Sequence, residues 1–232
     1  MPRRLLAVAV AVAGALSLTG LAACRDAPAV AVYVGSAQLT NAQVDQMVAE
    51  FPSAVTQRFA GRIRQLVVGN FVARELSHRL AAEHNITVPD ADLTPYQQDA
   101  QSAHISPTGA FVRLQAEADA GLHAIAQIGT PQAPTEADKH EVFASLVDAN
   151  RVQPDQYDQV KDQLDSPDMR SALGLRPVIR DAMSRYQVSV NPRYQPLGLP
   201  VPLTLAQGQV TTQVVVSLEP TASPAVSDLP TP

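Results

Sequence analysis

The segment from Val30 to Phe51 constrains the fold most, because it changes from a strand pattern to a helix pattern within a few residues. In residues 30–34, valines alternate with other side chains, and this alternation is typical of a short strand. Gly35 follows and predicts a turn, because glycine adopts a positive φ at little cost. We therefore expect the domain to begin with a strand and a turn.

A helix is expected soon after this turn. Thr40 is a favourable N-cap residue, and Gln43 lies three positions later with the side chain that completes a capping box. The apolar residues within 44–48 are spaced to form one face of a helix, and Pro52 predicts the end of that helix.

The strand at 30–34 needs a partner, because an unpaired strand edge exposes backbone donors and acceptors. The next β-branched alternation in the chain lies at 188–190, directly before Asn191 and Pro192. We therefore expect these two segments to pair, so that the two ends of the domain meet.

The chain between these segments has a helical pattern. Residues 53–84 form the longest stretch, with apolar residues at steps of three and four. Shorter helices are expected at 89–103, where Pro95 predicts a kink, and at 107–129, 135–150, 155–164 and 168–186. The sequence thus predicts a mainly α fold: a multi-helix module with one long helix and a small β pairing of the N-terminal and C-terminal strands.

The first residues are typical of an export signal rather than of a membrane-spanning helix. Arg3 and Arg4 precede an apolar run that is shorter than the roughly 20 residues a spanning helix needs. The run ends at LAAC, and Cys24 is the only cysteine in the chain, so an intrachain disulfide is excluded.

LAAC resembles the lipobox of bacterial lipoproteins. This resemblance implies cleavage before Cys24, acylation of Cys24 by fatty acids such as palmitate, and anchoring at the outer, extracytoplasmic face of the cell membrane. The alternative is an ordinary signal peptide that leaves Cys24 as a free thiol.

The sequence divides into four parts: a lipoprotein signal peptide at 1–23, a tether at 24–29, a helical domain at 30–194 and a tail at 195–232. The tail is rich in proline and is expected to be largely disordered. Only 203–205 and 210–218 have a strand pattern within it.

Charge and motifs narrow the functional classes. The formal net charge of −5 argues against nucleic acid as a partner. The chain has no glycine-rich nucleotide loop and no Gly-x-Ser-x-Gly motif, so no cofactor is expected. His140 and Glu141 begin like a zinc-binding helix, but Ala144 replaces the second histidine, so no metal site is expected.

The two ends of the helical domain resemble a known family. The residues AVYVGSAQLTNAQVDQMV, the long helix after them, and RYQVSVNPRY near the end are similar to the SurA/PrsA-type extracytoplasmic chaperone domain (SurA N-terminal-like), in particular to the actinobacterial lipoproteins that carry it. The resemblance implies a cradle of helices that binds unfolded or exported polypeptides without catalysis.

Many members of that family also carry a parvulin-type prolyl isomerase domain. The sequence around His104 faintly resembles the start of such a domain, but the strands that should follow are missing. The chain is therefore not expected to be an enzyme, although a peptidyl-prolyl isomerase and a structural or adaptor lipoprotein for one envelope partner stay open as alternatives.

Four apolar residues are candidates for contact with an unfolded client: Met47, Phe51, Phe59 and Phe71. Flexible or aromatic apolar side chains suit promiscuous contacts. The same residues would equally suit the core of the domain. Neither the client nor the oligomeric state follows from the sequence.

Overall fold

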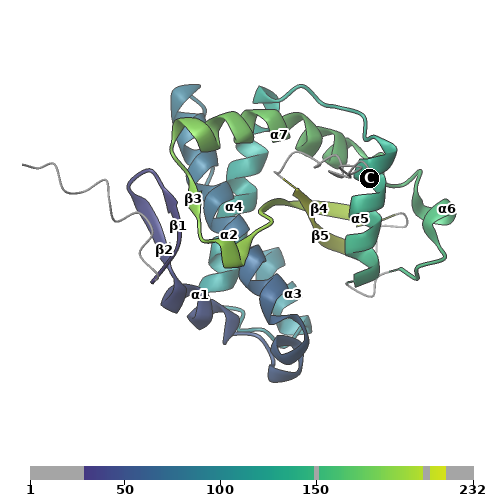
Figure 1. The fold of residues 1–232 in the computed structure, drawn as a ribbon, viewed down its shortest axis with the longest axis horizontal. Helices are drawn as coiled ribbons and strands as arrows, with labels where there is room; N and C mark the ends of the chain where they lie inside the picture. The colour runs from purple at the N-terminus through teal and green to yellow at the C-terminus, as the bar shows by residue number, and fades with distance from the viewer. Residues whose placement is uncertain (1–28, 149–151, 206–209, 218–232) are drawn as a thin grey trace, which may run out of the picture.

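The computed structural model describes residues 29–148, 152–205 and 210–217, and within them the protein is mainly helical (Figure 1). The described residues form seven α-helices: α1 (Asn41–Val48), α2 (Ser53–Glu83), α3 (Thr94–Ser102), α4 (Ala110–Ile125), α5 (Glu136–Asp148), α6 (Tyr157–Val160) and α7 (Pro167–Arg185). They also form five strands: β1 (Val30–Val34), β2 (Ala37–Thr40), β3 (Ser189–Val190), β4 (Gly198–Leu205) and β5 (Val210–Ser217).

Helices α2 and α4 pack against each other in the middle of the molecule, and α7 crosses one end of them (Figure 1). The hairpin of β1 and β2 lies on one flank, whereas α5 and α6 lie on the opposite flank. The core contains the largest fully buried side chains, which are Tyr194, Leu76, Leu80, Ile125, Leu146, Leu164, Met169 and Ile179. Its residues come from all parts of the helical module, so the helices share one core.

The predicted pairing of the two terminal strands is confirmed. Strands β1, β2 and β3 form an antiparallel sheet in the order β2-β1-β3. Val32 of β1 lies opposite Val190 of β3, and Tyr33 lies opposite Ser189. The predicted turn is also present, with Gly35 at φ 59°. The strand β2 was not expected.

A short 3-10 helix, η2 (Pro192–Tyr194), follows β3 and connects it by hydrogen bonds to β1 and α1. The backbone N–H of Asn191 donates to the carbonyl of Ala31 at 2.9 Å, and its side-chain oxygen accepts from Arg193 N at 3.2 Å. The hydroxyl of buried Tyr194 donates to Oδ1 of Asn41. The NPRY sequence therefore joins β3 to the N-terminus of α1.

The helix boundaries follow from local sequence. The capping box of α1 is present, since Thr40 N donates to Gln43 Oε1 at 2.8 Å and Gln43 N donates to Thr40 Oγ1 at 3.2 Å. The long helix α2 agrees with its prediction, and its one irregular residue is Phe59, at φ −127° and ψ 16°.

Two predictions on the shorter helices were wrong. Pro95 does not kink a helix over 89–103; it lies in the first turn of α3, where a missing N–H costs no intrahelical hydrogen bond. In the stretch 155–164 only α6 is helical, with turns on both sides, because its polar residues offer little apolar surface to bury.

Strands β4 and β5 pair as an antiparallel hairpin within the segment 195–232, which was predicted to be a largely disordered tail with a strand pattern only at 203–205 and 210–218. Strand β4 contacts α2 and α7, and β5 contacts α5. Pro200 and Pro202 fit within β4 because, in a two-stranded hairpin, residues two apart can direct their nitrogens away from the partner strand. Residues 218–232 lie outside the described residues.

Among the described helices, none has the length and apolar character required to cross a membrane. The expected signal peptide and Cys24 lie outside the described residues.

Candidate functional site

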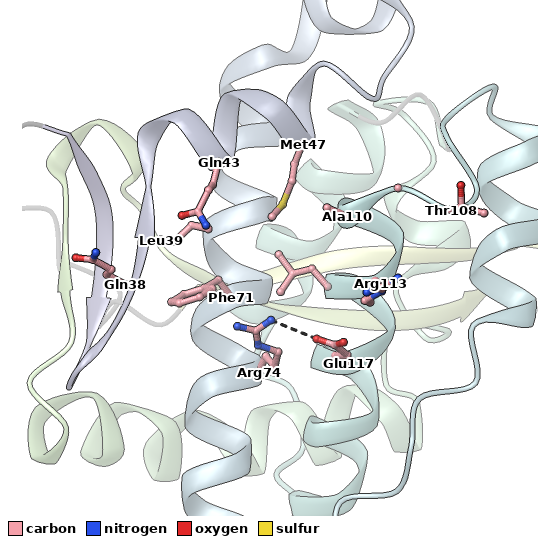
Figure 2. Close-up of a pocket in the computed structure, with 12 residues that line it drawn as sticks. Gln38, Leu39, Gln43, Met47, Phe71, Arg74, Thr108, Ala110, Arg113 and Glu117 are labelled. Carbon is pink, nitrogen blue, oxygen red and sulfur yellow. Dashed lines mark hydrogen bonds and ion pairs between the residues drawn. The ribbon is translucent and has the colours of Figure 1, made fainter.

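A recess of about 500 Å³ opens between β2, α1, α2 and the N-terminal half of α4 (Figure 2). Its walls come from segments that are far apart in the sequence, because the β1–β2 hairpin and α1 fold back onto the two central helices. The recess has an apolar floor and a polar rim.

The floor consists of Leu39 from β2, Met47 from α1, Phe71 from α2 and Leu114 from α4. Leu39, Phe71 and Leu114 also belong to the core, with exposed fractions of 3%, 5% and 3%. Met47 is only partly buried, so it is the most adaptable side chain of the floor. The floor is thus a part of the core surface that no other element covers completely.

The two central helices supply a charged group on the rim. Arg74 donates to Glu117 Oε2 of α4 at 3.2 Å and to Glu75 Oε1 at 2.8 Å, and its guanidinium lies 5.1 Å from the centre of the Phe71 ring. Figure 2 shows the Arg74–Glu117 ion pair across the recess wall. The charge of Arg74 is therefore already compensated.

Arg113 is the second cation of the rim, one turn before Glu117 on α4. It is exposed, and within the described part of the chain its guanidinium makes no hydrogen bond or ion pair. The recess accordingly contains two guanidinium groups and one carboxylate, Glu117, on a chain whose formal net charge is −5.

The glutamine side chains at the opposite rim come from β2 and α1. Gln38 is exposed, and its amide has no partner within the described residues. Gln43 uses its oxygen in the capping box of α1. These amides can donate or accept hydrogen bonds at the mouth of the recess.

Glu50 holds the N-terminus of α4 in place beside α1. Its carboxylate accepts hydrogen bonds from Ala110 N at 2.9 Å and from Phe111 N at 3.1 Å. A carboxylate at this position caps free N–H groups and complements the helix dipole. The N-terminus of α4 is therefore occupied by the protein itself.

The four predicted contact residues do not form one site. Met47 and Phe71 line the recess. Phe51 lies outside its lining and packs edge-on against Phe111, with ring centres 4.8 Å apart. Phe59 is the one residue of α2 with non-helical backbone angles, and the centre of its ring lies 5.1 Å from the guanidinium of Arg58. Cys24, the predicted acylation site, lies outside the described residues.

Sequence reasoning missed Leu39, Arg113 and Leu114 as residues of the recess. Leu39 belongs to β2, a strand that the sequence did not predict. The i, i+4 spacing of Arg113 and Glu117 was the available signal for a charged face on α4. No grouping of three or more histidine, cysteine or acidic side chains that could hold a metal occurs in the described ranges.

These features define a mainly helical protein with a small antiparallel sheet and an open recess. Comparisons with protein-family models, with curated proteins and with solved structures give no match.

Proposed function

We propose that this protein is a membrane-anchored extracytoplasmic lipoprotein that binds unfolded or exported polypeptides as a non-catalytic, SurA-like chaperone. Acylated Cys24 would hold the helical module at the outer face of the cell membrane. The module would shield apolar client segments transiently while they fold or move on.

The observation that carries this proposal is the antiparallel pairing of β1 with β3. The sequence resemblance rests on the two terminal segments, and their pairing is the arrangement that the resemblance requires. Apolar side chains at the base of the recess, including partly buried Met47, offer a contact surface for an apolar client segment.

Suppression of aggregation tests the chaperone activity. Denatured citrate synthase is diluted into buffer with and without the full chain, held in nanodiscs of neutral lipid, and light scattering is followed. We expect scattering to fall as the chain approaches equimolar amounts. A folded chain that leaves the scattering of several unrelated clients unchanged would contradict the proposal.

Membrane anchoring is tested separately at Cys24. We expect the wild-type chain in the membrane fraction with the mass of a diacylglyceryl group on Cys24, and the Cys24→Ser variant in the soluble extracellular fraction. A wild-type chain with an unmodified Cys24 thiol would contradict the lipoprotein part of the proposal.

One observation favours a second candidate, an adaptor lipoprotein with one dedicated partner. Among described residues with placed side chains, Val55 is the only large apolar residue classed as exposed, at 37%. A promiscuous chaperone usually offers a broader apolar surface. Recovery of one partner from the envelope in a fixed ratio, without protection of unrelated clients, would support the adaptor function.

A further inference from the structure

We propose that the recess between β2, α1, α2 and α4 binds an extended polypeptide segment in which an apolar side chain is followed two residues later by a carboxylate, so that both side chains point to the same face of the segment. The segment would pair with the free edge of β2, insert its apolar side chain over Phe71, and place its carboxylate against Arg113. This inference rests on the proposed function and specifies the kind of client segment that is bound.

The first argument concerns strand geometry. Strand β2 is at the edge of the sheet, so its outer backbone groups are not used by another strand of that sheet. Gln38 and Leu39 are consecutive residues of β2 and both line the recess. Because consecutive strand residues point to opposite faces, a recess that reaches both of them runs along the edge of the strand. An extended chain can add to such an edge.

The second argument concerns the floor. Leu39, Met47 and Phe71 line the recess beside this edge, and Met47 is the most exposed of the three (Figure 2). In an added strand, every second side chain would point toward this surface. The recess volume of about 500 Å³ accommodates one or two large side chains and leaves room for the backbone that carries them.

The third argument concerns charge. Arg74 is paired with Glu75 and Glu117, whereas Arg113 has no partner in the described part of the chain. The rim thus presents one guanidinium that has no ion-pair partner among the described residues, on a protein that is acidic overall. A carboxylate complements this charge, and a lysine at the same place in the client would be repelled.

Fluorescence anisotropy with short peptides tests the proposal on the full chain in neutral-lipid nanodiscs. The probe, called the Phe-Glu peptide, is a fluorescein-labelled octapeptide of alternating valine and threonine in which one central valine is replaced by phenylalanine and the next valine by glutamate. Its matched forms, the Phe-Gln and Phe-Lys peptides, carry glutamine or lysine in place of that glutamate. We expect the Phe-Glu peptide to bind most tightly and the Phe-Lys peptide most weakly.

The decisive variant is Arg113→Glu, and its matched control is Arg58→Glu, which makes the same charge change at an exposed arginine outside the recess. Circular dichroism establishes that both variants are folded. We expect Arg113→Glu to lower the affinity for the Phe-Glu peptide about fivefold or more, as for the loss of one close ion pair. The same variant should raise the affinity for the Phe-Lys peptide. Arg58→Glu should change the affinity for each of the two peptides by less than about twofold.

Methylation of alternate backbone amides of the Phe-Glu peptide tests the strand edge, because it removes the donors that β pairing needs. We expect this methylation to abolish binding. Equal binding of methylated and unmethylated peptides would overturn the proposal. The proposal would also be overturned if Arg113→Glu left the affinity for the Phe-Glu peptide unchanged. Tighter binding after deletion of residues 218–232 would overturn it as well, because it would identify that segment as the occupant of the recess.

The two proposals fail in different ways. If the chain suppresses aggregation but Arg113→Glu and Arg58→Glu protect clients equally, the recess is not the client site and the chaperone function stands. If the chain neither protects clients nor binds any of the peptides, both proposals are wrong.

Discussion

The hydroxyl of Tyr194 donates a hydrogen bond to Oδ1 of Asn41 at 2.7 Å, although the two residues are 153 positions apart. Tyr194 is fully buried, and Asn41 is the first residue of α1. The guanidinium of Arg193 also donates to the Tyr194 hydroxyl. This contact fixes the end of the helical module to its first helix.

Replacing Tyr194 by phenylalanine should lower the free energy of unfolding by about 1–2 kcal/mol, because it deletes a buried hydrogen bond. Replacing it by alanine should cost about 3–5 kcal/mol through the cavity that forms. Urea denaturation measures both. Tyr157→Phe, which removes a surface hydrogen bond to Glu136, is the control and should have a smaller effect. Equal effects of the two phenylalanine variants would contradict the role given to Tyr194.

Gly174 should not tolerate a side chain, because α7 closely approaches the loop between α4 and α5 at this residue. A Cβ at Gly174 would lie 2.3 Å from the carbonyl oxygen of Thr130 and 2.6 Å from its carbonyl carbon. Gly174→Ala should therefore lower the free energy of unfolding by about 1–3 kcal/mol through overpacking.

Gly61 provides the matched control for Gly174. It lies in α2, and a Cβ there would meet nothing within 4 Å. Gly61→Ala should raise the free energy of unfolding by about 0.5–1 kcal/mol, because alanine loses less backbone entropy in a helix. Thermal and urea denaturation should show a lower stability for Gly174→Ala and a higher stability for Gly61→Ala than for the wild type. A loss of stability in both would contradict the packing described for α7.

Asn70 is fully buried in α2, and neither atom of its side-chain amide has a hydrogen-bond partner in the described part of the chain. An unpaired buried amide is costly, so Asn70→Leu, which has the same branched shape and number of side-chain heavy atoms, should raise the free energy of unfolding by about 1 kcal/mol. Asn70→Asp should instead destabilise the protein more at neutral than at acidic pH, because it buries a charge. A loss of stability in Asn70→Leu would show that the amide has a role in the native state.

Asp138 of α5 should make stability dependent on acidic pH. Burial raises the pKa of this carboxylate, but hydrogen bonds from Thr135 and from Arg176, the latter at 2.8 Å, outweigh burial and lower the pKa of Asp138 below its usual value. A lowered folded-state pKa means that the unfolded chain binds more protons at low pH. The stabilisation is therefore complete above the unfolded pKa of about 3.9 and is lost as pH falls through the lower folded pKa.

Asp138→Asn should accordingly be less stable than the wild type at neutral pH, with a difference that shrinks as the pH falls below about 4. Urea denaturation across this pH range measures the difference. Asp155→Asn, at an exposed carboxylate, is the control for the loss of a surface charge and should leave the stability at neutral pH close to that of the wild type. A constant difference between Asp138→Asn and the wild type at all pH values would contradict the assignment.

Local signals in the sequence were sufficient for much of the fold. The capping box at Thr40 and Gln43, the turn at Gly35 and the apolar face of α2 each depend on residues within a few positions of one another. The β1–β3 pairing was also predictable, because few segments had a strand pattern and a strand needs a partner.

The β4–β5 hairpin and the recess were not predictable in the same way. The prolines of β4 are typical of a disordered segment, and they fit a strand only because the partner β5 lies on one side. Phe71 is a core residue that also lines the floor of the recess. Its position in the floor depends on how much of its side chain β2 and α4 cover. Such partial coverage arises from the tertiary arrangement and leaves no periodic pattern in the chain.

The contact of β5 with α5 has a consequence for biosynthesis. The inner side of α5 includes Val142, Phe143 and Leu146, which are all buried, yet the strand that contacts this helix is made only after α6 and α7. A nascent chain that has reached the end of α7 still lacks this strand. We therefore expect α5 to acquire its native environment last, once the ribosome has added Ser217, and a chain interrupted before that point to be the form most exposed to proteases.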